Sequence, residues 1–144
     1  MDFSLLLKKE VQDFINANLN SKTTELALKK NPFENIAYTE IIEQIVAKQK
    51  AKSKLPTWYT AEKIVYPSKV SVEQTSSEKT AAYKSSLFEG NSLIDLSGGF
   101  GIDDYYFAIT PITKGNTYQQ NNVMSIMLTM FITNPTFIIS FNLI

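Results

Sequence analysis

The chain has 144 residues, 14 basic residues that are all lysine, 14 acidic residues, and neither cysteine nor histidine. This length allows one ordinary domain with a hydrophobic core, and the balanced charge gives no overall attraction to nucleic acid. Without cysteine and histidine the sequence excludes a disulfide framework, a thiolate or zinc metal site and a Ser-His-Asp hydrolase. Residues 1–8 lack the basic and long apolar regions of a signal peptide, which favours a cytoplasmic protein.

Residues 1–60 are predicted to form a helical N-terminal region. After Ser4, a candidate N-cap, apolar residues recur at three- and four-residue intervals and mark one side of a helix. A second short helix is expected over 23–29, before Asn31-Pro32. A third helix has acidic residues early and lysines late, as the helix dipole favours. The apolar positions of the first and third helices are Leu7, Val11, Phe14, Ile15, Leu19, Ile41, Ile42, Ile45 and Val46.

The end of this third helix carries a basic patch beside an aromatic residue. Lysines at this density next to Trp58 could hold an RNA backbone near a stacking platform. A solvated helix end is the interpretation that we favour for the lysines, and a core anchor is the more common role of a tryptophan. The candidate RNA-binding residues are Lys48, Lys50, Lys52, Lys54 and Trp58.

Residues 61–74 are expected to form an extended connector, because Tyr66-Pro67 discourages helix and Val70 and Val72 alternate with polar residues. The next helix is predicted from a capping box, Thr75-x-x-Glu78, in which hydroxyl and carboxylate each satisfy a backbone donor. This helix should run to about residue 89 and end at the glycine that follows.

The most informative segment is a short apolar run, 93–96, that contains a carboxylate and is followed at once by glycines. Such a run is typical of a buried parallel strand, and a glycine turn leading into a helix lets backbone approach a ligand. A dinucleotide-binding fingerprint fits poorly, because Asp104 stands where its third glycine would be. A plain loop is the alternative. The residues of this segment are Asp95, Leu96, Ser97, Gly98, Gly99, Phe100 and Gly101.

This segment resembles the first motif of class I S-adenosylmethionine (SAM)-dependent methyltransferases, an acidic residue followed by alternate glycines. Asp95, Gly99 and Gly101 match the motif, and Ser97 stands at its first glycine. Ser77-Glu78 takes the place of the Pro-Glu that precedes the motif strand in trimethylguanosine-synthase-like methyltransferases.

The order of the segments is also similar to that of a bacterial family of RNA methyltransferases described as THUMP-like. The resemblance rests on a helical N-terminal region, on Leu55-Pro56-Thr57-Trp58, on residues 73–78 and on the glycine loop, and it ends near Ala108. It implies an α/β fold: a helical N-terminal region followed by the first strand-loop-helix unit of a Rossmann-like methyltransferase fold, truncated. In that scheme residues 75–108 begin the SAM-binding domain.

The resemblance further implies SAM as the cofactor and RNA as the substrate. The residues that it places at the cofactor are Asp95, Ser97, Gly98, Gly99, Phe100, Gly101 and Asp103. The residues that it places at the edge of the pocket, where they close it, are Thr75, Ser76, Ser77 and Glu78.

The tail, 109–144, is atypical, because residues 115–144 contain no charged side chain where about a quarter would be usual. One interpretation is a strand-rich end. A second is a membrane segment, which the apolar stretches on either side of Asn134-Pro135 are too short to supply. We favour the third, a frame-shifted or truncated product. Two functions remain: the N-terminal part of a methyltransferase, inactive as this chain, or a noncatalytic helical RNA-binding or protein-interaction module.

Overall fold

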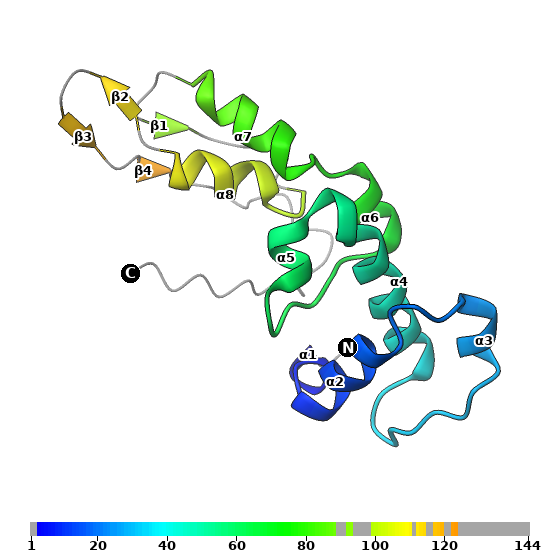
Figure 1. The fold of residues 1–144 in the computed structure, drawn as a ribbon. Coiled ribbons are helices and arrows are strands. Elements are labelled where there is room, and N and C mark those ends of the chain that lie inside the picture. Colours follow the sequence, from blue (N-terminus) through cyan, green and yellow to red (C-terminus); the bar gives the residue numbers. More distant parts are fainter. Residues whose placement is uncertain are drawn as a thin grey trace. The chain divides into compact units, whose positions relative to one another are not determined.

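The computed structural model describes residues 3–88 and 99–110 with their side chains, and the backbone of four short strands (Figure 1). The chain divides into two compact units, here called the N-terminal unit, residues 2–77, and the C-terminal unit, residues 78–144. None of the helices in the described ranges is long and apolar enough to cross a membrane.

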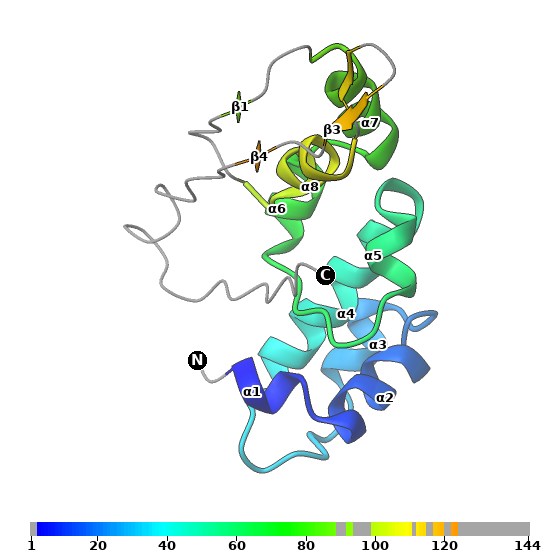
Figure 2. The ribbon, with the colours of Figure 1, turned by 90° about the vertical axis from the view of Figure 1, so that its left-hand side faces the viewer.

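Helix α4 is the centre of the N-terminal unit. It contacts α2, α3, α5 and α6, and Figure 2 shows the shorter helices α2, α3 and α5 grouped around it. The helices of this unit are α1 (Phe3–Leu6), α2 (Lys9–Ala17), α3 (Thr23–Ala27), α4 (Tyr38–Lys54), α5 (Pro56–Thr60) and α6 (Lys69–Gln74).

An aliphatic core lies between α4 and the helices that precede it. It explains the apolar spacing, because residues one turn apart on α2, Val11 and Ile15, face Ile41 and Ile45 of α4 in one cluster. The predicted helices over 23–29 and over the third segment are confirmed, although α3 ends at Ala27. The buried members of the core are Leu6, Val11, Ile15, Leu26, Ile36, Ile41 and Ile45.

The first predicted helix is wrong in its continuity. The chain forms α1 and α2 instead of one helix, because Lys8, the residue before α2, has an extended backbone with φ −60° and ψ 139°. Ser4 lies inside α1 rather than at a cap, and Leu7 falls at the break and is exposed. The apolar spacing therefore continues across a break that the pattern does not reveal.

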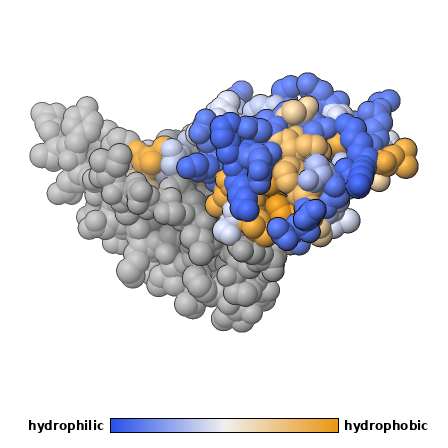
Figure 3. Space-filling view, turned by 90° about the horizontal axis from the view of Figure 1, so that it is seen from below, coloured by the Kyte–Doolittle hydropathy of each residue, from blue (hydrophilic) through white to orange (hydrophobic). Residues whose placement is uncertain are grey.

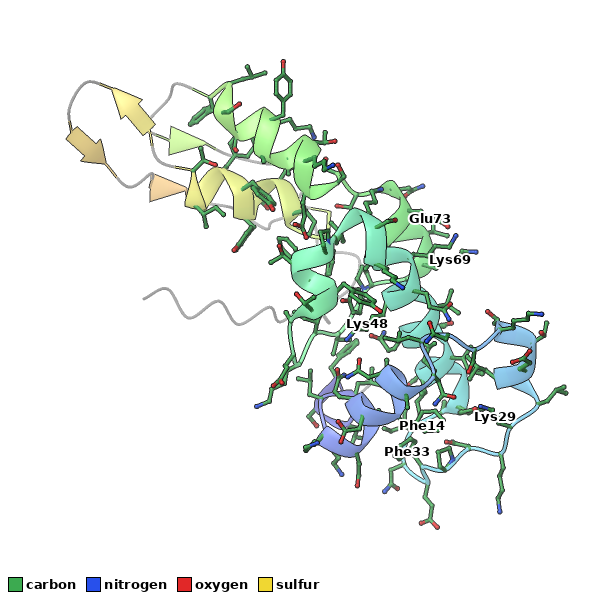
Figure 4. All side chains as sticks on the ribbon, viewed as in Figure 1. Phe14, Lys29, Phe33, Lys48, Lys69 and Glu73 are labelled. Atoms are coloured by element: carbon green, nitrogen blue, oxygen red, sulfur yellow. The ribbon has the colours of Figure 1, made fainter. Side chains whose placement is uncertain are left out.

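Aromatic side chains extend the core toward the surface. The ring of Phe14 on α2 meets Phe33 edge to face, with 5.5 Å between ring centroids, and lies 6.5 Å from the ring of Tyr38 (Figure 4). These three rings are only partly buried. On the face shown in Figure 3, the coloured part of the surface has an apolar area bordered by hydrophilic side chains.

A buried side chain fixes the segment between α5 and α6. The Gln44 amide donates to the Tyr66 carbonyl oxygen at 2.9 Å and accepts from the Tyr66 backbone N–H at 2.8 Å. The Tyr66 hydroxyl donates to the carbonyl of Trp58 at 2.8 Å, and burial raises the pKa of this hydroxyl above its usual value. Upstream, Lys63 turns the chain with a left-handed φ of 56°.

The second half of the predicted extended connector is helical. Ser68 caps α6, because its side-chain oxygen accepts a hydrogen bond from the backbone N–H of Ser71 at 3.2 Å. Val72 is fully buried whereas Val70 is 55% exposed. Two valines at alternate positions therefore mark opposite sides of a short helix here, and the predicted extended backbone is wrong for 69–74.

The C-terminal unit contains α7 (Glu78–Ser86) and α8 (Ile102–Ile109), which pack side by side (Figure 1). The helix expected directly after the glycine turn is confirmed as α8. Two strand pairs accompany these helices, one parallel between β1 and β4 and one antiparallel between β2 and β3. The strands are β1 (Ser92–Leu93), β2 (Ile112–Lys114), β3 (Thr117–Gln119) and β4 (Asn122–Val123).

The predicted α/β class, with a Rossmann-like strand-loop-helix unit, is wrong for this structure. The two ranges with described side chains, 3–88 and 99–110, are helical and contain no strand. Each of the described strands outside them has two or three residues and pairs with one other described strand. Such a strand length is at or below the usual lower limit. The rest of the apolar run, 94–96, lies outside the described residues.

Candidate functional site

The candidate site begins at the turn that leads into α8. Gly99 and Gly101 both have left-handed backbones, with φ of 51° and 75°, and Gly101 directly precedes the helix. No atom of the described residues lies within 4 Å of the Cβ that either glycine would carry, so backbone conformation rather than crowding requires glycine here. The same open space would let a ligand approach the turn.

Apolar anchors hold this turn in place. Phe100, between the two glycines, is buried, and so is Ile102 at the start of α8. The backbone N–H of Tyr105 donates to the carbonyl of Gly101 at 3.0 Å, which closes the first turn of the helix. The turn is therefore built from exposed backbone between buried side chains.

Carboxylates lie at the beginning of both helices of the C-terminal unit. Asp103 is in the first turn of α8 and Glu78 in the first turn of α7, where the positive end of the helix dipole favours negative charge. Asp103 accepts from the Lys84 ammonium at 3.0 Å. Glu78, only 9% exposed, accepts from the Tyr106 hydroxyl at 3.2 Å.

One side of α8 makes all of these polar contacts with α7. Asp103, Tyr106 and Thr110 follow at three- and four-residue spacing, and Thr110 pairs with Ser85 through their hydroxyls at 2.8 Å. Lys84 and Tyr106 are the two partners that the sequence interpretation missed. The spacing of Tyr106 three residues after Asp103 was a usable signal, because it places both side chains on one face of the helix.

Some of the predicted cofactor residues lie in the C-terminal unit, and others do not. Gly99, Phe100, Gly101, Asp103 and Glu78 lie in the C-terminal unit, linked through α7 and α8. The other pocket residues, 75–77, belong to the N-terminal unit and follow α6. Three predicted residues lie outside the described ranges: Asp95, Ser97 and Gly98.

The helix start predicted from the capping box lies at a different residue in the structure. Helix α7 begins at Glu78, so this carboxylate is in the first position rather than the third. Thr75 instead ends α6, with its backbone N–H donating to the carbonyl of Ser71 at 3.0 Å. The segment to which the capping box assigned one helix start therefore contains the end of one helix and the start of another.

The predicted RNA-binding residues are divided by burial. Lys48 and Trp58 are buried, each 6% exposed, whereas Lys50 and Lys52 are exposed. The Lys48 ammonium donates to the Asn16 side-chain oxygen at 2.8 Å and lies 5.8 Å from the centroid of the Tyr59 ring. Within the described ranges no group of three acidic side chains could hold a metal ion.

Comparison with known proteins gives one informative likeness. No family model matches the chain, and no curated protein matches it. The chain is similar to a solved structure described as "Crystal structure of putative methyltransferase from Porphyromonas gingivalis W83", with 28% identity and a TM-score of 0.60. The match covers 75% of this chain and 27% of that one. The likeness supports a methyltransferase-like origin.

Proposed function

We propose that residues 1–144 are the N-terminal part of a SAM-dependent methyltransferase that acts on RNA. The observation that carries this proposal is the likeness to the Porphyromonas gingivalis protein, at 28% identity over 75% of the chain. A likeness at this identity supports the class of protein. The cofactor, the RNA substrate and a cytoplasmic location remain our proposals.

The glycine turn is the proposed cofactor site. SAM, when bound, supplies a methyl group on a positively charged sulfonium next to an amino-acid group. The left-handed backbone at Gly99 and Gly101 and the open space beside it fit the approach of such a ligand. Asp103, at the start of α8, and Asp95, just upstream, provide the negative charge that suits its ammonium and sulfonium groups.

We also propose that these residues alone transfer methyl groups at a negligible rate. Methyl transfer gains most from holding donor and acceptor in line, which requires both ends of the cofactor and the substrate to be fixed. The chain spans 27% of the length of the neighbour. By the resemblance to class I methyltransferases, its candidate residues would surround the amino-acid end of the cofactor only.

Titration calorimetry with SAM tests the cofactor proposal. We expect binding by the full chain that is lost in Asp95→Ala and weakened in Asp103→Ala. Asp13→Ala is the matched control, because Asp13 is an exposed carboxylate on α2 whose partner is Lys9. No binding at millimolar SAM, or equal weakening by the control, would contradict the proposal.

Incubation with labelled SAM and total cellular RNA tests the rate. We expect no methyl incorporation above background from the purified chain. Incorporation that disappears in Asp95→Ala would show that these residues form a working site and would overturn the proposed inactivity.

The second candidate is a noncatalytic helical module that binds RNA or protein. It is favoured by the self-contained core of the N-terminal unit, which needs no contribution from the glycine turn. Calorimetric titration of the chain with SAM and, separately, with RNA distinguishes the two candidates. RNA binding without any SAM binding would support the module.

A further inference from the structure

The lysines of α4 form two groups rather than one patch. Four of them stand at alternate positions, and residues four apart share one side of a helix. Lys50 and Lys54 therefore share one side, whereas Lys48 and Lys52 share the other. Lys48 is buried against Asn16, so the second side presents only Lys52 to solvent.

Lys50 and Lys54 both contact Glu73 of α6, a contact that the sequence pattern does not predict. The Lys50 ammonium lies 3.0 Å from the Glu73 carboxylate, and both side chains are nearly half exposed. The Lys54 ammonium donates to the backbone carbonyl of the same Glu73. Lys69, at the first position of α6, is exposed and lies on the same helix as Glu73 (Figure 4).

The charge of this cluster is positive. Lys50, Lys54 and Lys69 are accompanied by one carboxylate, Glu73, and the carbonyl that accepts from Lys54 carries no formal charge. The pKa of Glu73 lies below its usual value, first because of its hydrogen bond with Lys50 and further because Lys69 and Lys54 are near. The carboxylate therefore stays ionised and still leaves two positive charges uncompensated.

We propose that Lys50, Lys54 and Lys69, here called the lysine triad, bind successive phosphates of single-stranded RNA. The proposal rests on the proposed function, because it takes RNA as the substrate of the methyltransferase. Lys50 and Lys54 are four residues apart and so are displaced by about 6 Å along the helix. Lysine ammonium groups act as point charges without fixed fork geometry, which suits contacts to a backbone rather than to particular bases.

A membrane surface fits this cluster less well. Helices that lie on membranes bury an apolar face beside their lysines. Of the large side chains described on α6, Val70 is the exposed apolar one, and a single valine offers little area for insertion. An acidic polypeptide would also satisfy the charges, and polyglutamate is therefore a competing ligand in the test below. RNA therefore matches both the charge and its arrangement.

Fluorescence anisotropy with a labelled uridine-rich RNA of about 20 nucleotides tests the proposal. The full chain is expected to bind with a dissociation constant of roughly 1–100 µM. Lys54→Glu and Lys69→Glu should each weaken binding by at least about fivefold and lower the salt slope by about 0.7 to 1. Lys52→Glu is the matched control, since it makes the same charge change on the other side of α4, and it should change affinity by less than about twofold.

Lys69→Glu is included because this variant is expected to remain folded. A glutamate at the first position of a helix is favoured by the helix dipole, which offsets its repulsion from Glu73 one turn along the helix. Lys69→Glu should therefore unfold close to the denaturant concentration of the wild type. Equal weakening by Lys52→Glu and Lys69→Glu would overturn the proposal. So would anionic phosphatidylserine vesicles or polyglutamate that bind more tightly than RNA and respond to the same variants.

Parallel SAM titration keeps this proposal separate from the previous one. The triad shares no residue with the proposed cofactor site, so Lys54→Glu and Lys69→Glu should leave SAM binding unchanged. SAM binding without triad-dependent RNA binding would refute the triad alone. RNA binding through the triad without SAM binding would refute the proposed cofactor and leave the triad standing.

Discussion

Aliphatic burial dominates the N-terminal unit, whereas the two helices of the C-terminal unit are joined by a row of polar contacts. Of the eight largest fully buried side chains in the described residues, seven lie in the N-terminal unit and one, Ile102, in the C-terminal unit. By contrast, Tyr83 in α7 and Leu87 just after it are exposed by 65% and 63%. Among the described residues, the glycine turn and its carboxylates thus belong to the unit with fewer large buried aliphatic side chains, and the unit with more of them carries the lysine triad.

The largest expected effect tests the core of the N-terminal unit. Ile45 is fully buried on α4, and replacing it with alanine removes three carbons and leaves a cavity. Ile45→Ala should lower the free energy of unfolding by about 2–5 kcal/mol, measured by urea denaturation followed by circular dichroism. Ile109→Ala makes the same change at a half-exposed site of α8 and should cost less than about 0.5 kcal/mol. Similar losses would break the comparison.

A smaller effect is expected from the buried hydrogen bonds of the Gln44 side chain in the N-terminal unit. Gln44→Met keeps the side-chain length but removes both hydrogen bonds to the Tyr66 backbone, which should cost about 2 kcal/mol. Gln49→Met is the control, because Gln49 donates to the carbonyls of Leu19 and Ser21 at a partly exposed site where water can replace it. Equal destabilisation of both variants in urea would show that burial does not decide the cost.

Polar contacts of the C-terminal unit should be weaker still. Tyr106→Phe removes the hydroxyl that donates to Glu78, and the expected loss is about 1 kcal/mol. Hydrogen exchange of the α7 and α8 amides measures it, because faster exchange should be confined to these helices. Tyr83→Phe, which removes an exposed hydroxyl from α7, is expected to leave exchange unchanged. Unchanged exchange in Tyr106→Phe would deny that this contact stabilises the helix pair.

The smallest effect concerns pH. Burial lowers the pKa of Lys48 below its usual 10.5, so the folded protein releases this proton at a lower pH than the unfolded chain. Between those two pKa values the unfolded chain binds more protons, and stability should therefore rise with pH. Urea denaturation of the wild type and of Lys48→Met up to pH 10.5 should show a gain in the wild type only. Parallel curves would mean that Lys48 titrates alike in both states.

Local patterns predicted the helices better than their arrangement. Local patterns located four helices: α2 and α4 by their apolar spacing, α3 by the Asn31-Pro32 that follows it, and α8 by the glycine turn that precedes it. The fold class failed because a sheet depends on partners distant in sequence, and an apolar run does not show whether it has them. The break at Lys8 and the helix α6 were not predicted, for a related reason. The break depends on the backbone angles of one residue, and α6 depends on tertiary burial of Val72.

The candidate site was likewise only partly predictable from the sequence. The glycine turn was recognisable, because left-handed backbone at Gly99 and Gly101 demands that residue type. The partners of the carboxylates were not, because the pairing of Lys84 with Asp103 joins residues on different helices. For the same reason, the sequence pattern indicated one patch made of the α4 lysines. In the structure Lys48 is buried, and Lys69 of α6 belongs to the lysine triad.

The left-handed turn at Lys63 has a practical use for protein engineering. It lies after α5, whose last turn is closed by the bond from the Ala61 N–H to the Thr57 carbonyl, and before Tyr66, which Gln44 holds. Glu62 and Lys63 are exposed between these two fixed points. Exposed turns of this kind accept inserted sequence, so a short peptide tag or a labelling site placed after Glu62 should leave the N-terminal core, the lysine triad and the glycine turn undisturbed.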